Sequence, residues 1–308
     1  MVKTPTTVGA PADLRGRRRM GERAIEGALL VCALASVATT LGILLTLAGE
    51  TLAFFGEVRV RDFLLGTRWA PGFTQPTYGV LPLLKGTLYV TGIGILVAIP
   101  LGLAVAIYLS EYAPERLRRV LKPVLELLAG IPTVVLGFFA LYFLTPLLKS
   151  VIPGLEIFNV LSGGLVVGVM ITPTIASLSE DAMRSVPQGL REAAFGLGAG
   201  RRRVALRVVM PAALSGIVAA IILGFARAIG ETMIVAIAVG NCPNMSFDPR
   251  VCQSTMTGAI VNVATGDTPA GSLDFRALFA VGSTLFTVTF ILNYLSHRIV
   301  RRFREAYD

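Results

Sequence analysis

The chain has 308 residues, of which 54% are hydrophobic and only 15% are charged, and its mean hydropathy is +0.72. This composition excludes a soluble globular domain. The net charge of +9 comes mostly from short arginine clusters, which we assign to contact with anionic lipid headgroups and not with nucleic acid.

The first 23 residues are polar and basic, and they predict an N-terminal tail (1–23) ahead of a membrane domain (24–308). Six apolar stretches follow, and each reaches the roughly 20 residues that a helix needs to cross the hydrocarbon. We therefore expect an all-α polytopic membrane protein with six transmembrane helices, at about residues 24–55, 86–110, 123–148, 159–179, 211–240 and 277–300.

Lysine and arginine are distributed unevenly between the segments that connect these helices. With both termini in the cytoplasm, 20 of the 28 basic residues lie in inner segments and 7 in outer segments. This asymmetry agrees with the positive-inside rule. It places the N-terminus, the C-terminus and the loop 181–207 on the cytoplasmic side.

That cytoplasmic loop contains the most informative pattern in the chain. Glu192, Ala193 and Ala194 are followed after three residues by Gly198, and then by a basic stretch that leads to Pro211. Good helix formers ahead of a glycine cluster predict a short helix that ends in a tight turn. The two alanines would give this helix a low-profile face that another protein can approach closely.

The spacing resembles Glu-Ala-Ala-x3-Gly-x9-Ile-x-Leu-Pro, the cytoplasmic loop of permease subunits in binding-protein-dependent ABC importers. Val208 stands for the isoleucine and Met210 for the leucine. The resemblance implies the type I ABC importer permease fold. It also implies that this loop is the coupling helix, which fits a cleft on an ATPase subunit. The alternative is an ordinary amphipathic connection between two transmembrane helices.

The fifth predicted helix carries two ionisable side chains, Arg227 and Glu231. Residues at positions i and i+4 lie on one helical face, where they can pair. They would lie roughly 24 and 30 Å along the helix from Pro211, past the midplane toward the outer side. Ionisable groups at such a depth are costly and usually face a bundle interior or a watery path.

The sequence around this pair, Arg-Ala-Ile-Gly-Glu-Thr-Met, resembles the permeases of the high-affinity phosphate importer, and its methionine favours the PstC-type subunit over the PstA-type. Leu-Ser-Glu-Tyr-Ala (109–113) and Gly-Ile-Pro-Thr-Val-Val (130–135) support the resemblance. It implies that Arg227 and Glu231 take part in phosphate translocation. The alternative is a structural pair that locks this helix to a neighbour.

The same resemblance implies the partners. They are two PstB-type ATPase subunits, a second permease of the PstA type and an extracytoplasmic PstS-type phosphate-binding protein. The sequence alone would also permit a homodimer of permeases.

The chain lacks the motifs of a catalytic subunit. None of its four lysines stands in a Gly-Lys-Ser/Thr phosphate-binding loop. A single histidine, far from the cysteines, provides no zinc site, and no Gly-x-Ser-x-Gly occurs. We therefore expect a non-catalytic subunit without a cofactor, with ATP bound by its partner.

Cys242 and Cys252 lie in a predicted outer loop, ten positions apart, and we expect them to form a disulfide in an oxidising compartment. The alternative is two unpaired thiols. Cys32, expected to be buried in the first helix, should stay reduced.

Three other functions remain compatible with the sequence. The chain could be a permease for another oxyanion, such as phosphonate, sulfate or molybdate. It could be an ATP-independent carrier, or a membrane sensor that does not transport.

Overall fold

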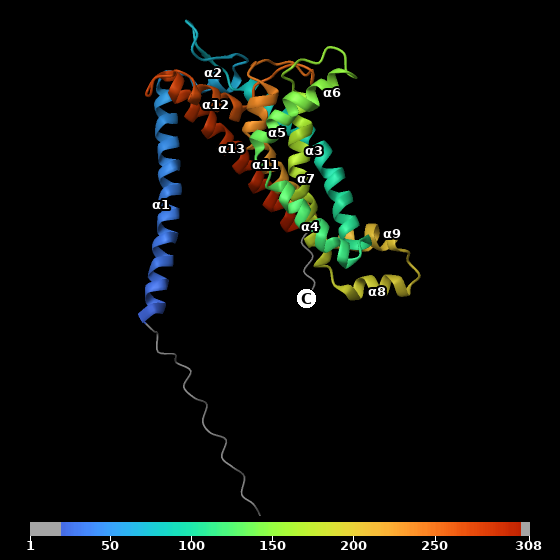
Figure 1. The fold of residues 1–308 in the computed structure, drawn as a ribbon. Coiled ribbons are helices and arrows are strands. Elements are labelled where there is room, and N and C mark those ends of the chain that lie inside the picture. The colour runs from blue at the N-terminus through green and yellow to red at the C-terminus, as the bar shows by residue number, and fades with distance from the viewer. Residues whose placement is uncertain (1–19, 303–308) are drawn as a thin grey trace, which may run out of the picture. The chain divides into compact units, whose positions relative to one another are not determined.

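The computed structural model describes residues 20–302, and Figure 1 shows their fold. Contacts divide the chain into a first unit that ends at Ala48 and a compact body that begins at Gly49. Most of the predicted tail, 1–23, lies outside the described residues, and helix α1 (Met20–Glu57) begins within its last part. Cys32 is exposed on α1, so the expectation of a buried thiol is wrong.

The body is almost entirely helical. Its described part contains one two-stranded antiparallel hairpin, and four π-helical turns interrupt or follow its helices. Its elements are α2 (Val60–Leu65), β1 (Trp69–Ala70), β2 (Thr77–Tyr78), α3 (Leu81–Ile107), η1 (Tyr108–Tyr112), α4 (Glu115–Ala129), α5 (Thr133–Phe139), η2 (Ala140–Leu144), α6 (Thr145–Lys149), α7 (Val160–Arg184), α8 (Gln188–Gly196), α9 (Arg201–Val204), η3 (Ala205–Val209), α10 (Met210–Ala212), α11 (Leu214–Ile229), η4 (Val235–Val239), α12 (Met256–Thr265) and α13 (Leu273–Arg302).

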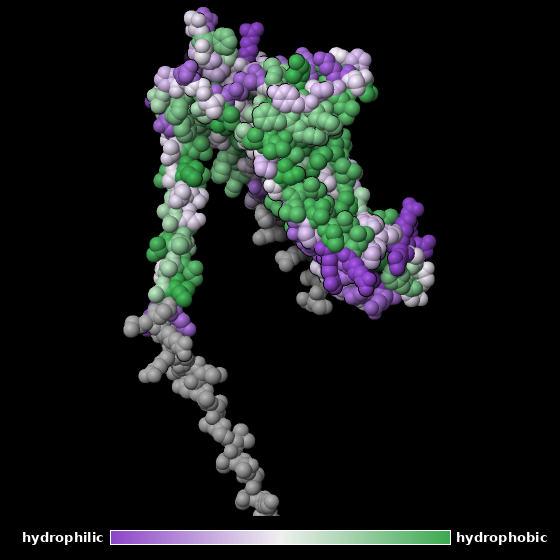
Figure 2. All heavy atoms as spheres, viewed as in Figure 1, coloured by the Kyte–Doolittle hydropathy of each residue, from purple (hydrophilic) through white to green (hydrophobic). Residues whose placement is uncertain are grey.

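Within residues 20–302, four helices are long and apolar enough to cross a membrane, and they correspond to α1, α3 with η1, α7 and α13. Two further candidates are bent pairs: α4 with the segment Thr133–Lys149, and the segment Arg201–Ala212 with α11. Counting each pair as one span gives the six that the sequence predicts. Apolar side chains form a band across the helices of the body, and polar side chains gather at its two ends (Figure 2).

Both bent pairs differ from the straight helices expected from the sequence. The first bends by 84° at Gly130–Pro132, where proline lacks the N–H that would continue the helix. The second bends by 73° at Ala213, just after Pro211 and the π-helical turn η3. The expected helix 211–240 is therefore wrong in two respects. It bends near its start, and it ends at Ile229.

Helix α12 lies in a segment expected to be an outer loop. Its ten residues are too few to span a bilayer. The side chain of Thr255 caps the helix by accepting a hydrogen bond from the Gly258 amide at 3.1 Å. In Figure 1, α12 and α6 lie at one end of the body and α8 and α9 at the other.

The centre of the body is the crossing of α3 and α7. Gly94 on α3 faces Gly164 and Gly168 on α7, so the two backbones approach closely. A Cβ atom added to Gly168 would lie 2.8 Å from the carbonyl oxygen of Gly94. Side chains of both helices, with those of α11 and η4, form the main buried cluster around this crossing.

We predict that Gly168→Ala destabilises the protein, because the new methyl group meets backbone that cannot rotate away. Overpacking of this kind costs about 1–3 kcal/mol. Thermal unfolding of the purified protein in detergent measures the effect. Gly92→Ala on α3 is the matched control, since nothing lies within 4 Å of its added Cβ. Equal unfolding temperatures for both variants would contradict the close crossing.

Candidate functional site

Helix α8 (Gln188–Gly196) is the short helix expected in the loop 181–207. It ends as the glycine cluster predicts, since Gly198 has a φ of 80°, a conformation that other residues adopt only at a cost. Backbone hydrogen bonds close the turn. The amide of Ala199 donates to the carbonyl of Ala194 at 3.0 Å, and that of Gly198 to Phe195 at 2.9 Å.

The two alanines of α8 lie on different faces. Ala193 is exposed together with Glu192, whereas Ala194 packs against a buried cluster from α7, α9 and α11. Of the two alanines expected to form the approachable face, Ala193 is therefore the more exposed, and Ala194 is partly buried. The exposed surface of α8 instead continues to Leu197, whose side chain is 90% exposed.

Arg191 ties α8 to the rest of the body, and sequence reasoning missed this residue. Its guanidinium donates to the Glu111 carboxylate at 3.1 Å and to the carbonyls of Met183 at 2.7 Å and Val186 at 2.6 Å. These partners lie in η1 and at the end of α7. Because Glu111 is 80 positions away in sequence, the pattern around Glu192 gives no sign of the pairing.

A pocket of about 470 Å³ lies beside this contact. It is lined by Ser110, Glu111, Tyr112, Ala113, Pro114, Arg184, Gln188, Arg191, Phe195 and Arg201. The pocket lies between part of α8 and η1, and Arg191 and the partly buried Ala194 are among the side chains that hold α8 to the rest of the body.

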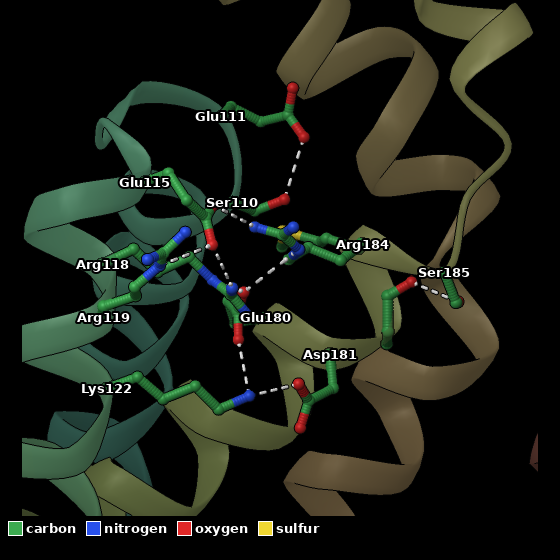
Figure 3. A network of polar contacts seen from close by, with 12 residues as sticks. Ser110, Glu111, Glu115, Arg118, Arg119, Lys122, Glu180, Asp181, Arg184 and Ser185 are labelled. Atoms are coloured by element: carbon green, nitrogen blue, oxygen red, sulfur yellow. Dashed lines mark hydrogen bonds and ion pairs between the residues drawn. The ribbon is translucent and has the colours of Figure 1, made fainter.

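A network of charged side chains joins α4 to α7 near the same end (Figure 3). The carboxylate of Glu180 is fully buried, and it accepts from Arg118 at 2.7 Å and from Lys122 at 2.9 Å. Lys122 also pairs with Asp181. A buried carboxylate is tolerated only with such partners, so α4 and α7 are joined here by charge as well as by packing. Arg118 and Glu180 are 62 positions apart, so no local sequence pattern indicates this network.

Arg227 and Glu231 do not pair, which corrects the expectation from their spacing. Helix α11 ends at Ile229, so the two residues do not share a helical face. Arg227 donates to the Thr174 hydroxyl and to the carbonyl of Ala129, each at 3.2 Å. Glu231 instead accepts from the amides of Met233 at 3.0 Å and Ile234 at 3.1 Å.

The two charges therefore have different roles. Arg227 is exposed, and within residues 20–302 it forms no ion pair. Its contact with Ala129 lies at the carbonyl end of α4, where a cation is favourable. Glu231 is buried and caps the helical segment that leads into η4. An unpaired arginine is a better attractor for an anion than an arginine neutralised by glutamate.

The disulfide expected between Cys242 and Cys252 is present. Within the described part of the chain, no group of three or more histidine, cysteine, aspartate or glutamate side chains could hold a metal ion.

Comparison with known proteins assigns the chain to a family. The family described as the inner membrane component of binding-protein-dependent transport systems matches residues 98–305. The chain belongs to this family. A Bacillus subtilis protein named as a probable ABC transporter permease is 37% identical over 92% of this chain and 94% of its own length. The phosphate transport system permease protein PstC of Haemophilus influenzae is 34% identical, over 83% and 85% respectively.

Solved structures show the same fold. The methionine ABC transporter MetNI aligns with a TM-score of 0.59 at 21% identity, over 73% of this chain and 96% of its own. A bacterial ABC transporter for alginate import aligns with a TM-score of 0.63 at 14% identity, over 93% and 100%. The all-α, type I ABC importer permease fold predicted from the sequence is confirmed.

We predict that substitutions at Arg227 and Glu231 act independently. Free energies of unfolding in detergent for Arg227→Gln, Glu231→Gln and the double variant should be additive within about 0.5 kcal/mol. The reason is that neither side chain contacts the other. A buried ion pair would instead lose about 3–5 kcal/mol in each single variant, and the double variant would recover much of it. Such recovery would show that the two residues pair.

Proposed function

We propose that this chain is the PstC-type permease subunit of an ATP-driven importer for inorganic phosphate. The observation that carries the proposal is helix α8, which has exposed residues on its surface and is joined to the body by Arg191, in a chain of the permease family. Phosphate as the substrate is supported by relatives named PstC from several organisms at 30–34% identity. The unpaired guanidinium of Arg227 suits an anionic cargo.

In this proposal the chain itself is non-catalytic, and a pair of PstB-type ATPase subunits supplies the energy. Helix α8 and both termini face the cytoplasm, as the distribution of basic residues indicates. A PstS-type binding protein delivers phosphate on the outer side. One permease offers one α8, so a second permease of the PstA type completes the pathway.

A chain of polar contacts links α8 to Arg227, the residue proposed to attract the anion. Arg191 connects α8 to the end of α7. Glu180, one turn earlier on α7, holds α4 through Arg118 and Lys122. The last carbonyl of α4, that of Ala129, holds Arg227 on α11. Each link is a direct polar contact, and we expect a shift of α8 against the body to change the position of Arg227.

We predict that cells producing this chain with its ATPase, second permease and binding protein take up radiolabelled phosphate. Excess unlabelled phosphate should compete, whereas equal excesses of sulfate, molybdate or a phosphonate should not. Uptake should cease when the ATPase is omitted, because the sequence contains no Gly-Lys-Ser/Thr phosphate-binding loop. Competition by another oxyanion would reassign the substrate, and uptake without the ATPase would favour a carrier.

We predict that Ala193→Trp prevents the ATPase from co-purifying while the chain still accumulates in the membrane. Ala193 is exposed, so the added ring leaves the fold intact but enlarges a face that must enter a cleft. Ala264→Trp is the control, since Ala264 is an exposed alanine in α12 at the other end of the body. Normal co-purification with Ala193→Trp would remove this face of α8 from the docking surface.

A further inference from the structure

Lys85 is a second cation without an acidic partner, at the end of the body opposite α8. It is the only charged residue among the 27 of α3. Within the described residues it forms no ion pair. Its ammonium group donates to the Gln253 side-chain carbonyl at 2.8 Å and lies over the rings of Phe247 at 5.0 Å and Tyr89 at 5.3 Å.

This position is unfavourable for a cation that has only a structural role. Lys85 lies in the second turn of α3, near the positive end of the helix dipole. It is partly removed from water, which costs further free energy. The rings of Phe247 and Tyr89 and the Gln253 amide lower the free-energy cost of this burial, but they do not neutralise the charge. A basic residue placed at such a cost in an apolar helix indicates a functional role.

The surroundings of Lys85 are fixed in place. Gln253 is fully buried, and its amide nitrogen donates to the carbonyl of Ser246 at 2.8 Å. It directly follows Cys252, which the disulfide to Cys242 holds. Close packing adds to this, because a Cβ on Gly86 would lie only 2.1 Å from the carbonyl oxygen of Ser254. The Gln253 amide oxygen is therefore held in position to accept a hydrogen bond from the Lys85 ammonium group.

The acidic residue in this loop, Asp248, is already paired with Arg250. Asp248 lies in the same loop, but Arg250 donates to both of its carboxylate oxygens, at 2.7 and 2.9 Å. Those hydrogen bonds hold the pKa of Asp248 at about 2. Asp248 therefore stays ionised and paired with Arg250. Of the three ammonium hydrogens of Lys85, Gln253 takes one, and among the described residues no second hydrogen-bond acceptor takes the others, which have only the rings of Phe247 and Tyr89 nearby.

We propose that Lys85 and the disulfide-held loop 242–253 form an anion-receiving site for a tetrahedral oxyanion. The site lies at the end of the body opposite α8, and this inference rests on the proposed phosphate import. Lys85 provides the charge, and Gln253 fixes the direction of its remaining N–H groups. The site raises the local concentration of the anion before it reaches Arg227, and it holds the anion weakly because one cation serves it.

The test measures initial phosphate uptake by the complete transporter across a range of phosphate concentrations. Lys85→Met should lower uptake at limiting phosphate by about fivefold or more and raise the concentration for half-maximal uptake. Lys85→Arg should retain uptake within about twofold, because it keeps the charge. Lys149→Met removes an exposed cation from α6, at the same end of the body, and should leave uptake unchanged.

Two results would overturn the proposal: normal uptake with Lys85→Met, or an equal loss with Lys149→Met, which would indicate a general surface field. The amount of co-purified ATPase shows whether each variant assembles. If Lys85→Met does not assemble, Gln253→Glu decides, because a carboxylate there would neutralise Lys85 in place. Its uptake should fall as predicted for Lys85→Met, and unchanged uptake would contradict the site. Absence of phosphate uptake by the unaltered chain would instead refute the proposed function.

Discussion

The burial of one carboxylate, Glu180, determines how the inner half of the body is held together. Removing this charge from water is costly, and close contacts with Arg118 and Lys122, together with Arg184 at 3.9 Å, make the position tolerable. Arg118 and Lys122 belong to α4, a helix without a single buried residue of its own. Apolar packing therefore contributes little to the position of α4, and its place against α7 depends on charge. The position of α4 in turn determines where the following bend lies and where the Ala129 carbonyl meets Arg227.

Much of the fold could be predicted because the bilayer limits the possible structures. Six apolar stretches of sufficient length match, in the described residues, four candidate spans and two bent pairs, and the glycine cluster at Gly198 matches the end of α8. What the sequence could not show are the bends and partners. A proline predicts that a helix is disturbed, but the 84° and 73° angles depend on the neighbours that accept the bent segments.

The candidate site shows the same division. The pattern around Glu192 was sufficient to locate α8, because every informative residue is local in sequence. The pairing of Arg227 with Glu231 was inferred wrongly, since i and i+4 face one another only while the helix continues, and α11 ends between them. Arg191 with Glu111, and Glu180 with Arg118, are separated by 80 and 62 positions. Such contacts form only after α3, α4 and α7 have packed.

The glycine crossing of α3 and α7 has a consequence for how the protein can change over time. Where Gly94 and Gly168 meet, no side chain separates the two backbones. The space at this point therefore depends on both helices together. An added methyl group on one helix cannot be absorbed by a new rotamer on the other. Because the partner residue is itself a glycine, it has no side-chain volume to lose in compensation. Both positions should therefore stay glycine as long as the two helices keep this distance.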